Sequence, residues 1–510
     1  MSDAMTALNA VRRGRELSRL ADGARIDLVV IGGGITGAGI ALDAASRGLS
    51  VVLAEKHDLA FGTSRWSSKL VHGGLRYLAS GNVGIARRSA VERGILMTRT
   101  APHLVHAMPQ LVPLLPEMGR GQRALVRVGF AAGDVLRALA GTRASVLPRS
   151  RRVSAGRAAA MVPAVRREGL DGALLAYDGQ LIDDARLVVA VARTAAGHGA
   201  TILTRVSASS ATGTSVVLTD ELSGESLSVS ARAVINATGV WAGEVDTSIT
   251  LRPSRGTHLV FDAAAFGNPS AALTIPIPGE VNRFVFAMPE QLGRVYLGLT
   301  DEEAPGPVPD VPQPTPAEIA FLLDTVNTAL RVQLTTADVT GAYAGLRPLI
   351  DTGEDGRTAD LSRDHAVLES ASGMFSVVGG KLTEYRYMAE DVLDRAVAAR
   401  GLTAGPCRTR DLPLVGAGPG PVAGVAPASL VARFGAESAE VVALARCARP
   451  TEAVAEDIDV TRAEFEFAVT HEGALNVEDI LDRRTRIGLV DTDRQRAARV
   501  AEEFLAARAP

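Results

Sequence analysis

The feature that most constrains this chain is an apolar run, residues 28–31, that leads directly into Gly32, Gly34 and Gly37. Glycines at this spacing allow a tight turn from a strand into a helix and let the backbone approach a pyrophosphate, whose charge the helix N-terminus stabilises. We expect that helix over residues 35–46 and a second strand over 50–54, with Glu55 at its end for the ribose hydroxyls of a nucleotide. This complete order predicts a dinucleotide-binding βαβ unit rather than a glycine-rich turn without a ligand.

Length and composition limit which classes of protein this chain can belong to. A chain of 510 residues has room for roughly three domains. Its formal net charge of -3 argues against nucleic acid as a partner. The two cysteines, Cys407 and Cys447, form no metal-binding motif, which favours a reducing compartment and predicts no metal site. Because no signal peptide and no run of 18 uncharged apolar residues is found, we expect a protein on the cytoplasmic side without a spanning helix.

One region is strongly basic although the whole chain is nearly neutral. Residues 119–157 hold nine arginines and a single acid, Asp134. Apolar residues recur within it near helical spacing, namely Leu125, Val128, Val135, Leu136 and Leu139. The pattern is typical of an amphipathic helix on an anionic membrane surface, but a solvated helix that packs one face on its own domain would look the same. Both interpretations stay open.

Glycine turns recur after later strands. Strand-like residues 200–206 and 215–219 lead to the strand 231–236, which ends in a turn at Gly239, and residues 374–383 again deliver glycines to a helix start. We therefore predict a nucleotide-binding domain built from three segments, residues 1–102, 180–254 and 340–402.

A second domain is predicted from residues 103–179 and 255–339. Alternating patterns over 258–261, 283–288 and 294–299 indicate an antiparallel sheet that covers a substrate chamber, and a helix is expected over 317–330. A Gly/Pro/Ala linker follows Asp411, and we expect the C-terminal domain, residues 403–510, to be helical without strands. The predicted fold class is thus α/β plus α.

Several motifs together resemble one family, the FAD-dependent, quinone-linked glycerol-3-phosphate dehydrogenases, over nearly the full length. The match rests on residues 31–41, 63–78, 183–187, 344–349, 362–365, 379–383 and 472–488, of which Ser68-Lys-Leu-Val-His-Gly-Gly-Leu-Arg-Tyr-Leu is the most specific. Small departures occur at Leu299 and Glu384. The usual Pro-Trp pair is replaced by Met288-Pro289, which affects the expected floor of the substrate pocket.

The resemblance implies a Rossmann-like FAD-binding domain of the two-dinucleotide-binding type, an antiparallel substrate domain and a helical C-terminal cap. A nicotinamide cofactor is disfavoured because the chain has one complete glycine fingerprint. The residues implied to bind FAD are Gly32, Gly34, Gly37, Glu55, Thr63, Ser64, Ser68, Lys69, Leu70, Gly73, Val206, Gly239, Gly380 and Leu382.

The implied substrate is a phosphorylated alcohol, which needs cations to hold its phosphate. Family similarity places Arg76, Arg347, Arg363, Lys381, Tyr77 and Thr383 around it. An isolated cation is usually a surface ion pair, but the glycine-bearing motifs around Arg76, Arg347 and Lys381 favour binding. Arg363 could instead belong to an exposed turn and pair with Asp364.

The predicted catalytic set is His258, His72 and Arg347. A histidine suits removal of the hydroxyl proton because its ordinary pKa lies near neutrality. Either His258 or His72 could be that base, and either could be structural. Arg347 could stabilise the developing alkoxide without accepting a proton.

The activity implied is oxidation of sn-glycerol 3-phosphate to dihydroxyacetone phosphate by hydride transfer to the flavin, with electrons passed to a membrane quinone. This implies a cytoplasmic protein, peripheral on the inner face of the cell membrane and attached through the basic region 119–157, and it is compatible with a homodimer. The alternatives are an oxidase that makes hydrogen peroxide, an amine or amino-acid oxidase, and an interaction protein with a structural flavin.

Overall fold

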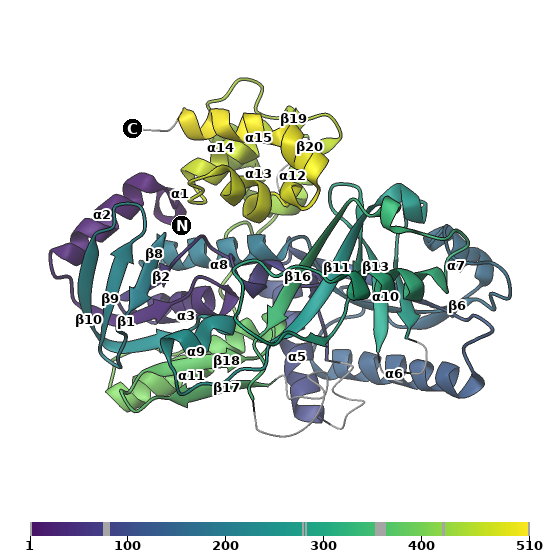
Figure 1. Ribbon diagram of the computed structural model, residues 1–510, viewed down its shortest axis with the longest axis horizontal. Helices are drawn as coiled ribbons and strands as arrows, with labels where there is room; N and C mark the ends of the chain where they lie inside the picture. Colours follow the sequence, from purple (N-terminus) through teal and green to yellow (C-terminus); the bar gives the residue numbers. More distant parts are fainter. Residues whose placement is uncertain are drawn as a thin grey trace.

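The computed structural model describes residues 3–74, 82–277, 280, 283–351, 364–420 and 424–507. Two sheets lie side by side, and the C-terminal unit, residues 424–507, sits above them (Figure 1). The two sheets with their covering helices and the largely helical C-terminal unit confirm the predicted fold class, α/β plus α. In the described part of the chain, no helix has both the length and the apolar character that crossing a bilayer requires.

The first sheet carries the glycine turn. Its strands run in the order β17-β18-β10-β1-β2-β7, and β8 and β9 extend it beside β10. All neighbours on the main path are parallel except β17 and β18. The strands are β1 (Ile26–Ile31), β2 (Val51–Glu55), β7 (Thr201–Thr204), β8 (Val206–Ser209), β9 (Ser215–Asp220), β10 (Ser226–Asn236), β17 (His365–Glu369) and β18 (Phe375–Gly379).

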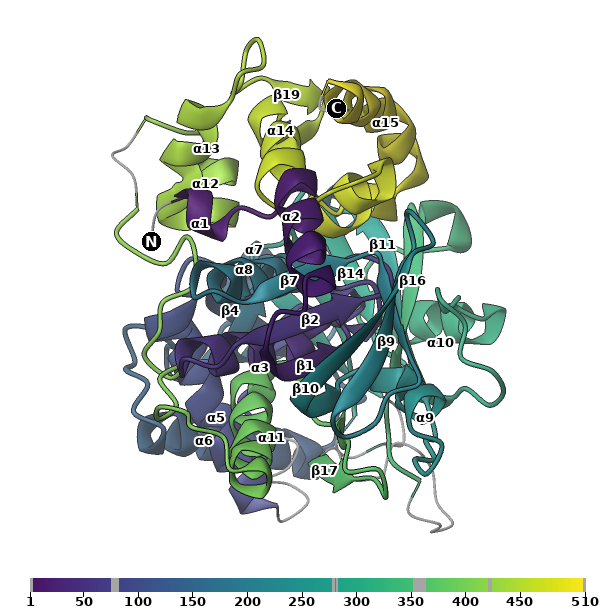
Figure 2. The same ribbon diagram turned by 90° about the vertical axis from the view of Figure 1, so that its left-hand side faces the viewer.

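Both faces of this sheet are covered, which explains why β1 reads as a continuous apolar run. Leu28 and Val30 pack with helices on one face, while Val29 and Ile31 join a separate core on the other. The helices of the first face are α3 (Ile35–Ser46), α8 (Asp184–Gly197) and α11 (Tyr385–Arg400), and α3 and α11 lie together in Figure 2. On the other face lie β8, β9 and α2 (Ala10–Ala21), which follows the short α1 (Asp3–Thr6).

The second sheet is mostly antiparallel, as the alternating sequence predicted. Its order is β15-β11-β14-β13-β12-β4-β6-β3, with β16 beside β11 and β5 beside β6. Only β4 and β12 pair in parallel among these described strands. The strands are β3 (Leu70–Val71), β4 (Val105–Pro113), β5 (Arg151–Val153), β6 (Ala173–Leu181), β11 (Ser254–Asp262), β12 (Ala272–Pro276), β13 (Phe284–Glu290), β14 (Arg294–Gly298), β15 (Glu302–Glu303) and β16 (Gly341–Arg347).

Helices close this second sheet on two sides. The predicted helix 317–330 is α10 (Pro316–Asn327), which begins at a capping box between Thr315 and Glu318. The helices α5 (Val83–Ile95), which ends in a π turn, and α6 (Arg120–Leu139) lie on the side opposite the C-terminal unit (Figure 1). Other short helices are α7 (Ala155–Met161) and α9 (Ala242–Val245).

The predicted domain boundaries stay a prediction. Two strands nevertheless join the second sheet from segments that we assigned to the nucleotide domain, since β3 pairs with β6 and β16 pairs with β11. Segments of both predicted domains therefore meet in one sheet.

The C-terminal unit corrects one expectation. It contains α12 (Ala428–Phe434), α13 (Ser438–Leu444), α14 (Arg462–Thr470) and α15 (Asp491–Ala506), but also a hairpin of β19 (Ala453–Ala455) and β20 (Ile458–Thr461). The prediction of no strands was wrong because these strands are too short for alternation to be visible. Their turn depends on Asp457, whose φ is 61°.

Gly37 sets how closely α3 can approach β1. A Cβ at this position would lie 1.9 Å from the Gly32 carbonyl oxygen, and neither backbone segment can move away without breaking the turn. We expect Gly37→Val to lower the free energy of unfolding by at least about 3 kcal/mol, measured by thermal or urea denaturation. Gly14→Val is the control, since nothing lies within 4 Å of a Cβ there. Equal stability of the two variants would contradict this packing argument.

Candidate active site

A large cavity of about 1210 Å³ is lined by residues from both sheets. It extends from the carboxyl ends of β1 and β2, past the loop after β2, to α6. Its volume exceeds the roughly 300–1,000 Å³ of a typical small-molecule site, so it can hold an extended ligand. Carboxyl ends of parallel strands are where α/β sheets place their ligands.

The glycine turn at one end of the cavity fits a dinucleotide. Gly32 has a φ of 108°, and a Cβ there would lie 2.7 Å from the carbonyl oxygen of Ala237. Gly34 lines the cavity at the start of α3 and provides no side-chain cap, so the helix N-terminus is suited to a pyrophosphate. Gly37 does not line the cavity, and its part is the helix packing described above.

Glu55 lies where the sequence placed it, at the end of β2 and in the cavity lining. One carboxylate oxygen accepts a hydrogen bond from Gly33 N at 2.6 Å and the other accepts one from His57 N at 2.8 Å. Burial raises the pKa of Glu55, while these two backbone bonds oppose that rise. A carboxylate has about four lone-pair sites, so it can also accept from ribose hydroxyls.

Most of the other residues predicted to bind FAD line the same cavity. These are Thr63, Ser64, Ser68, Leu70, Gly73, Val206, Gly239, Gly380 and Leu382. Lys69 is the exception, because its side chain is 1% exposed and forms an ion pair with Asp184 at 2.8 Å instead of lining the cavity. Its positive φ of 56° and this pair direct the ammonium into the protein, a contact that sequence spacing did not reveal.

His72 has the geometry of an oriented base. Its Nδ1 lies 3.1 Å from Asp178 Oδ2, and its side chain is 44% exposed in the lining of the cavity. The Asp178 carboxylate also pairs with Arg93 at 2.5 Å. Burial raises the pKa of Asp178, but Arg93 and His72 lower it to about 2, so this acid is ionised at neutral pH.

Gly73 completes this arrangement. A Cβ at Gly73 would lie 2.1 Å from the Arg93 guanidinium, so the glycine allows Arg93 to reach Asp178. No sequence motif predicted a role for Asp178 or Arg93. Their partners are 106 and 85 residues away along the chain.

His258 also lines the cavity but is far less accessible. It is 1% exposed, its Nε2 lies 2.9 Å from Ser68 Oγ, and its ring stacks on Tyr343 at 4.7 Å. Burial, with Lys69 and Arg347 nearby, holds the pKa of His258 well below its ordinary value. The imidazole is therefore neutral at physiological pH. Its Nδ1 is buried without a hydrogen-bond partner among the described residues.

The two described cations predicted to bind substrate line the cavity, and each has an acidic neighbour. Arg347 lies 3.1 Å from Asp301, and Lys381 lies 3.1 Å from Glu384. Lys381 also donates to Ser89 Oγ at 2.7 Å. Thr383 lines the cavity as well. Arg76, Tyr77 and Arg363 lie outside the described residues.

Comparison with known proteins agrees with this geometry. Residues 27–386 match the family model described as FAD dependent oxidoreductase, and residues 407–507 match the C-terminal domain of alpha-glycerophosphate oxidase. Glycerol-3-phosphate dehydrogenase 1 of Mycobacterium tuberculosis (strain ATCC 25618 / H37Rv) is 74% identical over 507 residues, 98% of each chain. The glycerol-3-phosphate dehydrogenase of Mycobacterium leprae is 37% identical, over 91% of this chain and 81% of that protein.

A solved structure is similar to this protein over nearly its whole length. The glycerol-3-phosphate dehydrogenase of Bacillus halodurans, complexed with FAD, superimposes with a TM-score of 0.71 at 26% identity and covers 97% of this chain and 94% of that one. With a cavity whose glycine turn and acid fit a dinucleotide, these matches identify FAD as the cofactor. The chain belongs to the FAD-dependent glycerol-3-phosphate dehydrogenase family.

Proposed function

We propose that this protein oxidises sn-glycerol 3-phosphate to dihydroxyacetone phosphate and passes the electrons to a membrane quinone. The observation that carries the proposal is one cavity that is lined by the glycine turn as well as by His72, Arg347 and Lys381. A dinucleotide at the turn and an anionic alcohol at the basic side chains would share this enclosed space. The names of the close relatives support the same substrate.

The reaction needs groups that bind the phosphate, an acceptor for the hydride and a base for the hydroxyl proton. We infer that side chains of this protein supply the first and the third. Arg347 and Lys381 can hold the phosphate, since a guanidinium binds phosphate oxygens through several N–H groups and an ammonium attracts them as a point charge. Bound FAD supplies the acceptor for the hydride from C2 of the substrate. The remaining task is removal of the hydroxyl proton.

We assign that task to His72 rather than to His258. The Asp178 carboxylate can accept a hydrogen bond from the Nδ1–H of His72, which leaves Nε2 as the atom that takes the proton from the substrate. His258 is less suitable because it is almost fully buried and its low pKa makes it a weak base. Its bond to Ser68 instead positions the loop that precedes His72.

The position and surface of α6 support the proposal that electrons pass to a membrane quinone. Val126 and Phe130 on one side of this helix line the far end of the cavity. The helix also exposes Leu125 (45%), Val128 (65%), Val135 (58%) and Leu139 (68%) next to the basic residues of the region, and of these four Val135 and Leu139 lie outside the cavity lining. The helix α6 packs on the protein through Leu136 and presents an apolar strip to solvent, which supports the proposal that it binds a membrane surface.

The acceptor test compares turnover of sn-glycerol 3-phosphate with a quinone analogue under nitrogen and with oxygen alone. We expect fast turnover with the quinone analogue and little hydrogen peroxide in air. Glycerol and a 2-hydroxy acid serve as controls, and neither should be oxidised because neither has a phosphate. Equal rates with oxygen, with stoichiometric peroxide, would contradict the quinone assignment and favour the oxidase.

His72→Asn should slow anaerobic reduction of the bound flavin by about 100-fold or more, because general base catalysis is typically of that size. The affinity for sn-glycerol 3-phosphate should change little, since the phosphate contacts remain. Stopped-flow absorbance measures both values in one series. A variant that keeps its flavin and reduces it at the wild-type rate would exclude His72 as the base.

Val135→Ser combined with Leu139→Ser should weaken binding to anionic vesicles by about tenfold or more, since two exposed apolar side chains can no longer enter the lipid interface. Neither residue lines the cavity, so flavin reduction by substrate should be unchanged. Co-sedimentation with vesicles measures binding. The matched control, Leu222→Ser with Val332→Ser, removes two side chains that are 61% and 56% exposed elsewhere. The same loss in both double variants would contradict a membrane role for α6.

A further inference from the structure

The loop between β2 and β3 forms much of the cavity wall. We call residues 56–69 the cofactor loop; its lining side chains include His57, Phe61, Thr63, Ser64, Trp66 and Ser68. Two of its non-glycine residues, Ala60 and Lys69, have φ values of 62° and 56°. Such conformations are disfavoured in an isolated chain and persist where surrounding structure imposes them. The surroundings of this loop therefore determine its shape.

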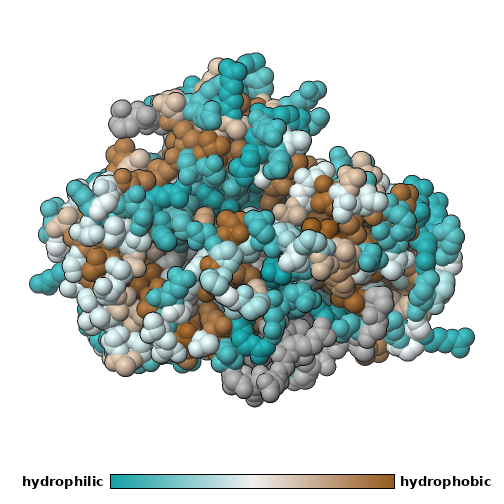
Figure 3. All heavy atoms as spheres, viewed as in Figure 1, coloured by the Kyte–Doolittle hydropathy of each residue, from teal (hydrophilic) through white to brown (hydrophobic). Residues whose placement is uncertain are grey.

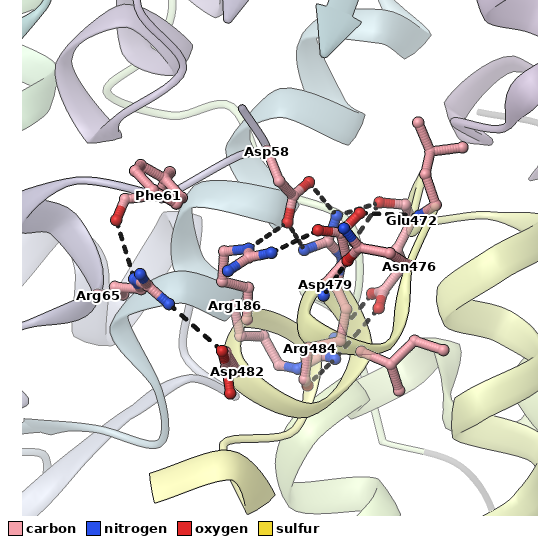
Figure 4. A network of polar contacts seen from close by, with 12 residues as sticks. Asp58, Phe61, Arg65, Arg186, Glu472, Asn476, Asp479, Asp482 and Arg484 are labelled. Carbon is pink, nitrogen blue, oxygen red and sulfur yellow. Dashed lines mark hydrogen bonds and ion pairs between the residues drawn. The ribbon is translucent and has the colours of Figure 1, made fainter. Parts of the chain in front are cut away.

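Asp58 ties the loop to the C-terminal unit. Its carboxylate is 1% exposed and accepts from Arg483 Nε at 2.6 Å and from the two Nη atoms of Arg484 at 2.8 Å each (Figure 4). Burial raises the pKa of Asp58, but the guanidinium groups of Arg484 and Arg483 lower it to about 2. Asp58 therefore stays ionised across the physiological pH range. Both of its carboxylate oxygens are bound by a segment more than 400 residues away in sequence.

Two contacts of Arg65, with Arg486 and with Asp482, join the other end of the loop to the same C-terminal segment, and two more lie within the loop. Arg486, itself 1% exposed, donates to the Arg65 carbonyl oxygen at 2.7 Å. Lys69 donates to the same oxygen at 3.0 Å. The Arg65 guanidinium donates to Phe61 O at 2.9 Å and lies 3.8 Å from Asp482. The segment 479–486 thus contacts the cofactor loop at both Asp58 and Arg65.

This segment is itself anchored to α8 and to Arg205, which lies between β7 and β8. Asp479 accepts from Arg205 at 2.7 Å. Arg186 on α8 binds Glu472 through both of its carboxylate oxygens, at 2.8 and 3.2 Å, and also donates to Arg484 O at 2.9 Å. On the face in Figure 3, hydrophilic residues occupy much of the junction below the C-terminal unit. The junction is therefore polar and directional, so it specifies one position of the segment.

We propose that the C-terminal unit is part of the FAD-binding apparatus, because its segment 479–486 holds the cofactor loop in the shape that binds FAD. Asp58, Arg484 and Arg486 are then positioning residues that act through the loop. The proposal does not depend on the substrate, the base or the electron acceptor. It also requires the reverse effect, since FAD bound against the loop must stabilise the segment by the same free energy.

The test measures FAD affinity of the apoprotein through quenching of flavin fluorescence, without turnover. Asp58→Asn and Arg484→Lys should each weaken FAD binding by about tenfold or more, the size expected from losing one charge-assisted hydrogen bond. Arg193→Lys is the matched control, since Arg193 joins α8 to the same unit through two bonds to Glu437 at 2.8 and 2.7 Å. Its FAD affinity should stay within about threefold of the wild type.

Two outcomes overturn the proposal. One is unchanged FAD affinity in Asp58→Asn and Arg484→Lys. The other is an equal loss in Arg193→Lys, which would show that the junction acts through overall stability alone.

If Asp58→Asn and Arg484→Lys fail to fold, amide hydrogen exchange of the wild-type protein with and without FAD tests the proposal instead. We expect FAD to slow amide exchange in residues 479–486 as well as in 56–69. Protection of the loop without protection of the segment would contradict the proposal.

Discussion

The structure depends on how closely α3 approaches β1, since this contact creates the site where a pyrophosphate can rest on a helix N-terminus. Gly37 permits the approach and Gly32 turns the chain with a φ of 108°. Once this corner is fixed, the end of β2 places Glu55 beside it, and the loop after β2 becomes the wall of a cavity shared with the second sheet. The second sheet adds His72 after β3 and Arg347 at the end of β16, while Lys381 follows β18 of the first sheet.

Ion pairs buried at the cavity wall set the positions of these side chains. Arg93 and Asp178 orient His72, and Arg484 and Asp58 hold the loop that forms part of the wall. Buried pairs of this kind contribute little net stability compared with apolar packing, but they are costly to break and fix one geometry. In this protein they coincide with the parts of the chain that must be held around a cofactor, so their value is in positioning.

Local patterns in the sequence were enough for the dinucleotide turn, because strand, glycines, helix and acid all lie within residues 26–55. Three strands of the second sheet, β11, β13 and β14, were also predicted, as was α10, because their patterns are visible over a few neighbouring residues. Contacts between distant segments were not predictable in this way. No local pattern joins Asp178 to His72 or Arg484 to Asp58, and the side chain of Lys69 lies in a motif that lines the cavity but is directed to Asp184. The apolar strip of α6 was predicted, but only the fold showed that Leu136 packs inward.

The most direct measurement for the central claim, that one cavity holds both FAD and a phosphorylated alcohol, is the visible spectrum of the purified holoprotein under anaerobic conditions as sn-glycerol 3-phosphate is added. The account predicts loss of the oxidised flavin bands at about one equivalent of substrate per flavin, because one hydride reduces one flavin. It also predicts no change with glycerol. A flavin that stays oxidised with sn-glycerol 3-phosphate, yet is bleached by dithionite, would contradict it.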